Sequence, residues 1–253
     1  MAPSTPGLAV SDVDLERDWD ELFATYWASW KSPLQAAGEL TFSNLGRGGP
    51  EEAASFEAAK STYLAAARAD PDQHWIKVED PGGGIVGGGC WTLCRHGARL
   101  ALVQRPACGF ETGSERDTLC RELYAQMRSR HLELMQDRTH AYGHGIWVLP
   151  DYRRGGAAAA VMNHWIEAVD KLGLEAYLES TAMSTALYLK SGFAIVEHPT
   201  MLFRRADPSQ DWRRLVRQLQ AQPIGIMWRP QRGGYAEGQT VLPWKGKPRR
   251  FKL

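Results

Sequence analysis

Residues 148–158 have the types and spacing of a binding site for an anion. An apolar segment ends at the start of this range, and an alanine-rich segment typical of a helix begins at its end. A helix that begins there presents unpaired backbone N–H groups and a partial positive charge. Gly155 and Gly156 have no side chains to block a close approach, and Arg153 and Arg154 add positive charge. The pattern predicts a pyrophosphate site, against the alternative of an ordinary strand-to-helix turn with two solvated arginines.

Strands and helices alternate around this turn. Strands are expected at residues 140–149, 175–181 and 193–203, with helices between them at residues 157–172 and 184–191. Gly173 and Gly192 follow the two helices, and glycine is the usual left-handed residue at a helix end. This alternation predicts α/β structure with a parallel or mixed sheet.

The remaining segments add helices and short strands to both sides of this unit. Helical spacing of apolar residues covers residues 14–30, 51–68, 114–137 and 209–220, and strand-like runs cover 8–10, 75–78, 85–93 and 224–228. Loops are expected at residues 43–50 and 95–113. The glycine runs 82–84 and 87–89 predict a β-hairpin rather than a phosphate loop, because no Lys-Ser/Thr follows them and no helix begins there.

Composition excludes several broad classes of protein. The chain has 253 residues and a formal net charge of +1, which disfavours wholesale nucleic-acid binding. Its four cysteines lack zinc-finger spacing, so we expect no metal site. No apolar run near residue 1 or elsewhere has the length of a signal or membrane segment, so we expect a cytoplasmic protein. We expect one domain over residues 1–228 and a basic, Gly/Pro-rich tail over residues 229–253.

Two short motifs resemble those of one enzyme family. The residues from Arg153 to Ala158 match the R/Q-x-x-G-x-G/A signature of GNAT N-acetyltransferases, after a V-x-P-x-Y-R lead-in. Further along the chain, Ala186 to Phe193 is similar to the family's A-x-x-L-Y-x-K-x-G-F signature. Ser184 stands where the family often has Ala, and Thr181 where it often has Asn. The detailed match covers residues 140–203, and the long N-terminal helical part is similar to fungal members.

The resemblance implies a fold and a cofactor site. The fold would be the GNAT fold, a mixed central sheet flanked by helices, whose splayed central strands hold acyl-CoA. The pantetheine of acetyl-CoA would pair along Ile146, Trp147 and Val148. Its pyrophosphate would lie on the amides from Arg154 through Gly155, Gly156 and Ala157 to Ala158. Arg153, Thr181 and Ser184 complete the expected cofactor-binding set.

The resemblance also implies a reaction, in which an amine attacks the thioester directly. Tyr188 matches the family's general acid, and His144 matches a histidine that belongs to a proton relay in arylalkylamine acetyltransferases. His140, Tyr142 and His144 alternate, so they should share one sheet face, with Tyr142 or His140 assisting His144. The alternatives are a structural histidine and a core tyrosine. Glu179 is the second candidate base, although strand periodicity places its side chain on the other face.

The sequence says less about the amine that accepts the acyl group than about the acyl donor. An aromatic or apolar small amine is expected from five aromatic residues, Trp27, Trp30, Phe42, Trp91 and Trp147. A polyamine would need carboxylates, and Glu39 is the only acid in the loop before Glu51. Acetyl is the default donor, and a longer acyl chain stays open. The alternative is a macromolecular target bound by the basic, aromatic tail, although we expect no nucleic acid and no membrane as partners.

Overall fold

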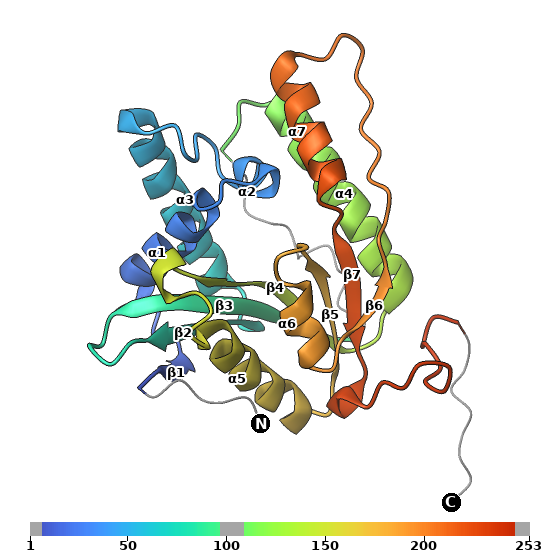
Figure 1. Ribbon diagram of the computed structural model, residues 1–253. Coiled ribbons are helices and arrows are strands. Elements are labelled where there is room, and N and C mark those ends of the chain that lie inside the picture. The colour runs from blue at the N-terminus through green and yellow to red at the C-terminus, as the bar shows by residue number, and fades with distance from the viewer. Residues whose placement is uncertain (1–6, 97–108, 246–253) are drawn as a thin grey trace, which may run out of the picture.

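A computed structural model describes residues 7–96 and 109–245 of the chain. Within them, seven strands form one twisted sheet in the order β1-β2-β3-β4-β5-β7-β6 (Figure 1). The strands are β1 (Ala9–Asp12), β2 (Gln73–Glu79), β3 (Ile85–Cys94), β4 (His140–Val148), β5 (Glu175–Ser180), β6 (Ala194–Glu197) and β7 (Gly225–Arg229). Only the pair β4 and β5 is parallel among these strands, and the other neighbours are antiparallel. The predicted mixed sheet is therefore confirmed.

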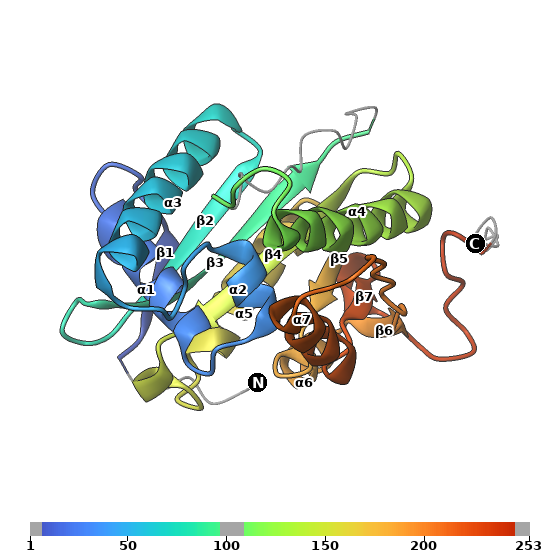
Figure 2. The same cartoon turned by 90° about the horizontal axis from the view of Figure 1, so that it is seen from above.

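Helices cover both faces of the sheet. They are α1 (Trp19–Lys31), α2 (Ala36–Thr41), α3 (Gly49–Ala69), α4 (Glu115–Met135), α5 (Ala157–Lys171), α6 (Thr185–Lys190) and α7 (Gln210–Ala221). The side that carries α5 and α6 is called the α5 face below, and the side that carries α1, α3 and α4 is called the α4 face (Figures 1 and 2). Helices α2, α4 and α7 pack on one another at one end of the sheet.

Each face has its own apolar core. On the α5 face, Val161, Trp165 and Val169 of α5 pack on the sheet. These residues lie four apart, so they form one stripe of the helix. On the α4 face, Phe23, Tyr26 and other aromatic residues of α1 pack with α3 and β4. The position of β4 between two cores fixes which side chains reach either face.

Some sequence expectations about the elements were wrong. Residues 36–41 form α2, which no periodic pattern indicated because the helix is only 6 residues long. The strand expected at 193–203 ends at Glu197, and residues 198–206 form no regular element. The glycine-rich hairpin is confirmed, since β2 and β3 are antiparallel neighbours. Most of the expected loop at 95–113 lies outside the described residues.

The glycines of β3 allow close packing on both faces. A Cβ added at Gly88 would lie 2.5 Å from the Ile76 carbonyl oxygen, and one at Gly89 would lie 2.9 Å from Val161 Cγ1. Larger residues would push α5 away from the sheet.

None of the described helices is both long and apolar enough to cross a bilayer.

Candidate active site

The central strands β4 and β5 diverge halfway along their length. Their parallel pairing runs from His140 opposite Glu175 to Gly143 opposite Leu178 and then ends. On its other side β4 stays paired with β3 as far as Val148. Strand β5 instead continues beside β7 (Figure 1). One backbone edge of β4, from Gly145 to Val148, is thereby left for another partner.

A β-bulge marks the point of divergence. Trp91 of β3 lies opposite Gly143, and Cys90 lies opposite Gly145, so His144 is an extra residue in β4. A bulge bends its strand and re-aims the side chains near it. The bulge therefore places His144 where the two strands separate.

The turn after β4 leads into the N-terminus of α5. Pro150–Tyr152 forms one 3-10 turn, and Arg154 and Gly156 both have positive φ, 63° and 90°. The helix has no side-chain cap, and its first turn consists of alanines. Ala160 N–H donates to the Gly156 carbonyl, so the amides before it point out of the helix end. This arrangement has the features with which helix ends bind anions, and the pyrophosphate site stays a prediction.

The two arginines of the turn have different surroundings. Arg153 donates from Nε to the Val148 carbonyl at 3.1 Å and from an Nη to the Ser29 carbonyl at 3.2 Å. Its guanidinium therefore ties the turn to the end of α1. Arg154 is exposed beside Gly155. Of the two, only Arg154 has a side chain exposed to an approaching anion.

A small apolar cavity lies on the α5 face where the strands diverge. The Tyr188 side chain, 5% exposed, forms part of its wall with Gly143, Gly145 and Trp165. Burial raises the pKa of the Tyr188 phenol above its ordinary range. The phenol therefore stays protonated at neutral pH, as a proton donor must.

Polar side chains occupy the α4 face at the same point. The Tyr142 hydroxyl donates to Glu179 Oε2 at 2.8 Å. His144 Nε2 lies 2.8 Å from Thr92 Oγ1, and its ring lies 4.6 Å from that of Tyr142. The expectation that Glu179 faces away was wrong: its carboxylate shares the face of Tyr142. The sequence could not reveal this contact, nor Thr92, because it does not give the register between neighbouring strands, which places Tyr142 opposite Thr92 and Tyr177.

Comparison with known proteins now decides the family. A model of the acetyltransferase (GNAT) family matches residues 19–193, which is more than half of the chain. The chain belongs to the GNAT acetyltransferase family. It is therefore an acyltransferase of the family that uses acetyl-CoA as acyl donor. A search of curated protein sequences gave no match.

Solved structures show the same GNAT fold. A mosquito arylalkylamine N-acetyltransferase-like protein, like 5b, is 12% identical over 88% of this chain and 99% of its own, with a TM-score of 0.56. A Corynebacterium glutamicum protein described as histone acetyltransferase HPA2 and related acetyltransferase is 16% identical over 89% and 97%, with a TM-score of 0.51. At these identities the likeness concerns the fold alone. The similarity to fungal members stays a prediction.

Several other predicted residues of this GNAT protein lie near the divergent strands. Ile146 lines the cavity. The Trp147 side chain points to the α4 face instead, where its indole N–H donates to Thr25 Oγ1 at 2.9 Å. The carbonyl oxygen of Trp147 lies beside β3, 2.4 Å from a Cβ added at Gly87, so the backbone groups on the open edge of β4 are those of Ile146 and Val148. Thr181 and Ser184 lie together just before α6, with their hydroxyl oxygens 3.5 Å apart.

His140 does not reach the divergence. It lies at the start of β4, 1% exposed, where Nδ1 is 2.7 Å from the Arg138 carbonyl and Nε2 is 2.7 Å from His131 Nε2. Burial lowers the pKa of both histidines, that of His131 to about 2. His140 is thus a hydrogen-bonded core residue, and the suggestion that it assists His144 was wrong.

Cys94 lies beside this histidine pair, and these three residues have the types of metal ligands. Two nitrogen ligands of a tetrahedral zinc ion lie about 3.3 Å apart, from Zn–N bonds of about 2.0 Å. The histidine nitrogens are closer, at 2.7 Å, which is a hydrogen-bond distance. Burial also raises the pKa of the Cys94 thiol to about 12. The geometry therefore fits a hydrogen-bonded pair of neutral histidines.

The aromatic residues expected to line the acceptor pocket are mostly core residues. Trp27, Phe42 and Trp147 are buried in the core beneath α1 and α3, and Trp30 packs against it. Trp91 packs on the α5 face, where it stacks on His74 at 4.2 Å. The abundance of tryptophan therefore reflects packing on two faces, and the expected aromatic pocket was wrong.

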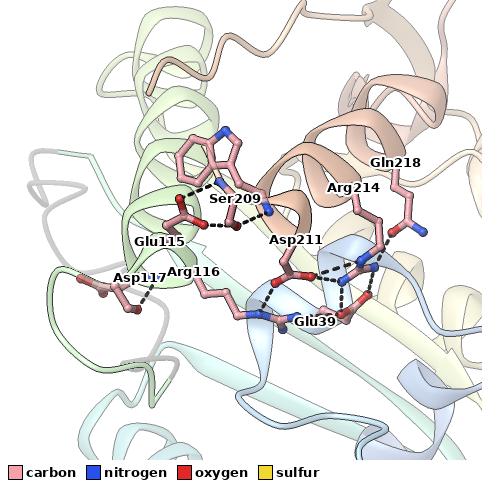
Figure 3. Close-up of polar contacts among 10 residues, drawn as sticks. Glu39, Glu115, Arg116, Asp117, Ser209, Asp211, Arg214 and Gln218 are labelled. Atoms are coloured by element: carbon pink, nitrogen blue, oxygen red, sulfur yellow. Dashed lines mark hydrogen bonds and ion pairs between the residues drawn. The ribbon is translucent and has the colours of Figure 1, made fainter. Parts of the chain in front are cut away.

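Glu39, the one acid considered for polyamine binding, is already engaged. It is 6% exposed and lies between two arginines, Arg116 of α4 and Arg214 of α7 (Figure 3). Arg214 donates to both of its oxygens, at 2.8 and 2.7 Å. Asp211 balances the charge by accepting from both arginines. This cluster joins α2, α4 and α7 and leaves Glu39 unsuited to a cationic substrate.

Proposed function

We propose that this GNAT protein transfers an acetyl group from acetyl-CoA to a small amine, which attacks the thioester directly. The observation that carries the proposal is the arrangement around the divergence of β4 and β5. Tyr188 lies on the α5 face of that point, and His144 lies on the α4 face. A proton donor and a proton acceptor therefore flank the one place where the sheet is open.

The residues around this opening suit acetyl-CoA. Its pantetheine amides would pair with the open backbone edge of β4 at Ile146 and Val148. Its pyrophosphate would lie on the amides of residues 154–158, beside the exposed Arg154. The site is not crowded: an added Cβ at Gly155 would meet only the Tyr152 carbonyl, at 3.3 Å. When bound, acetyl-CoA supplies an electrophilic thioester carbonyl and a thiolate leaving group.

His144 is the proposed base. An amine is mostly protonated at neutral pH, and it must lose a proton before its lone pair can attack. The neutral imidazole of His144 accepts that proton, directly or through a water molecule. The new bond joins nitrogen to the acetyl carbon, the carbon–sulfur bond breaks, and the nitrogen loses its second proton to solvent as the amide forms. Tyr142 assists indirectly, because its hydroxyl donates to Glu179 and so holds that carboxylate on the face that carries His144.

Tyr188 is the proposed acid. It donates its phenolic proton to the departing thiolate and regains one from solvent later. A phenol with a raised pKa is a weak acid, but the same apolar surroundings raise the pKa of a thiol beside it. Burial therefore raises the pKa of the phenol and the pKa of the thiol together. Proton transfer from Tyr188 can then still assist the departure of the thiolate.

The acceptor class is proposed as a small apolar or aromatic amine rather than a polyamine. The supporting observation is the engagement of Glu39 by Arg116 and Arg214, which removes one carboxylate from the acceptor side. The basic tail supports the macromolecular alternative less well, because Trp244 packs against Trp228 with ring centroids 5.5 Å apart. Its final basic residues lie outside the described residues.

A coupled assay tests this proposal. The purified protein is incubated with acetyl-CoA and single amines, and released thiol is measured. The panel holds an arylalkylamine, an alkylamine, spermidine and a lysine-containing peptide. We expect turnover with the first two. Turnover with the peptide alone would favour a macromolecular target, and no turnover with any amine, together with no binding of CoA, would refute the proposed function.

A further inference from the structure

The cavity beside Tyr188 borders the open strand edge at Gly145 and Ile146 and extends from there beneath the sheet. Beneath the sheet it is lined from β2 and β3 by Ile76 and Trp91, and from α5 by Val161 and Trp165. These four side chains all belong to the apolar core of the α5 face.

Glycines create the cavity. Gly89 and Gly143 lack the side chains that would fill it: a Cβ at Gly89 would lie 2.9 Å from Val161, and one at Gly143 would lie 2.7 Å from Trp165. Gly145 lines the cavity with its backbone only. Cys90, opposite Gly145, packs into the core of the α4 face, so a Cβ added at Gly145 would point away from the cavity, where it meets no described atom within 4 Å.

Trp165 presents its six-membered ring to the cavity. A Cβ added at Gly143 would lie 2.7 Å from Trp165 Cη2 and 3.3 Å from its Cζ2 and Cζ3 atoms. Trp165 is 4% exposed, so the wall that it contributes is apolar and closely packed.

We propose that this cavity is an acyl pocket, which receives the acyl chain of the donor thioester and restricts the enzyme to acetyl-CoA. The inference rests on the proposed function, since it concerns the donor of that reaction. The space admits about one water-sized group, which is also the size of a methyl group. Val161 and Trp165 set the depth of the pocket.

Size discrimination follows from close packing. Each methylene forced into a full cavity displaces side chains from their preferred rotamers and typically costs about 1–3 kcal/mol. Butyryl-CoA exceeds acetyl-CoA by two methylenes, so it should bind at least about tenfold more weakly. Val161→Ala removes two methyl groups from the wall and should reduce that ratio to about threefold or less.

Calorimetric titration with CoA, acetyl-CoA, propionyl-CoA and butyryl-CoA tests the proposal without any amine. The variants are Val161→Ala and a matched control, Val169→Ala, on the same helix and equally buried but outside the cavity wall. We expect the ratio of butyryl-CoA to acetyl-CoA dissociation constants to fall in the first and to stay unchanged in the second.

A third variant, Ile146→Ala, keeps the test decisive if Val161→Ala fails to fold. Ile146 lines the cavity and is only partly buried, so its truncation should cost less stability than one in the fully buried wall. We expect the ratio of butyryl-CoA to acetyl-CoA dissociation constants to fall as in Val161→Ala, with CoA itself less affected. Equal binding of acetyl-CoA and butyryl-CoA by the parent and all variants would overturn the acyl pocket. Failure to bind CoA at all would instead refute the proposed function.

Discussion

The two faces of the sheet differ sharply at the point where β4 and β5 separate. On the α5 face, Tyr188 lies among apolar side chains and glycines, with no other titratable group in the cavity wall except Cys90. On the α4 face, Tyr142, His144 and Glu179 lie close together with hydrogen-bond partners. One strand junction therefore separates a dry environment from a polar one.

The two environments suit the two opposite proton transfers of the proposed reaction, from the phenol of Tyr188 and to the imidazole of His144. An apolar environment keeps a phenol protonated until a strong base appears next to it. A polar, hydrogen-bonded environment stabilises the positive charge that a histidine gains when it accepts a proton. The strand at this point permits both, because His144 lies on the α4 face beside Tyr142 while Gly143 has no side chain on the α5 face, where Trp165 lies.

The largest expected effect on activity concerns Tyr188 on the α5 face. Tyr188→Phe keeps the aromatic ring and its contact with Phe193 but removes the proton donor. We expect kcat to fall by about 10²–10⁴-fold, with little change in the dissociation constant of acetyl-CoA. Steady-state kinetics measure this. Tyr124→Phe, which removes a hydroxyl that bonds Thr41 far from the junction, is the control and should stay active. Full activity of Tyr188→Phe would make Tyr188 a core residue only.

A smaller effect is expected on the polar face. His144→Gln should lower kcat/KM by about 10²-fold at neutral pH, because the ammonium form of the acceptor loses its base. The deficit should shrink as pH rises towards the pKa of the amine, since more acceptor then arrives neutral. The pH profile of kcat/KM for parent and variant measures this. If Glu179→Gln shows that profile and His144→Gln does not, Glu179 is the base.

The smallest effect concerns stability on the polar face. Burial lowers the pKa of His131 to about 2, whereas an unfolded histidine titrates near 6.5. Between these values the unfolded chain holds more protons, so stability falls as pH falls below about 6.5, by at most about 1.4 kcal/mol per pH unit. His131→Phe, which preserves the stacking on Tyr177, should flatten this dependence.

Urea unfolding at pH 7.5, 6.0 and 5.0 measures that slope. The partly exposed His164, which lies 3.1 Å from Asp12, provides the control substitution, His164→Phe. A slope in His131→Phe as steep as that of the parent would show that other groups, not the buried histidine, carry the acid sensitivity.

The sequence predicted the fold best where side-chain periodicity and turn glycines agreed. Residues 140–192 are such a region: alternation defines β4 and β5, and Gly173 ends α5 in the left-handed conformation that glycine favours. The two family motifs lie in this region too, so the acid and the anion site could be proposed before any coordinates. Helix α2 was missed because so short an element has no period of its own.

The candidate site was harder to predict where contacts depend on register. Glu179 and Thr92 reach Tyr142 and His144 because of the register between strands, which no local pattern reveals: Tyr142 lies opposite Thr92 and Tyr177, and Glu179 follows Tyr177 on the same face. Glu39 was considered as a ligand for cations, yet its two arginine partners are distant in sequence. The structural role of Arg153 could not be predicted for the same reason. Its guanidinium donates to the Ser29 carbonyl on α1, which is remote from the motif in sequence.

The most direct test of the account is calorimetric titration with acetyl-CoA of the parent and two charge-reversed variants. Arg154→Glu places negative charge at the N-terminus of α5, and Lys171→Glu places it at the exposed opposite end of the same helix. We predict that the parent binds acetyl-CoA, that Arg154→Glu binds about tenfold more weakly or worse, and that Lys171→Glu binds like the parent. No binding by the parent, or equal weakening by both variants, would contradict the proposed acetyl-CoA site.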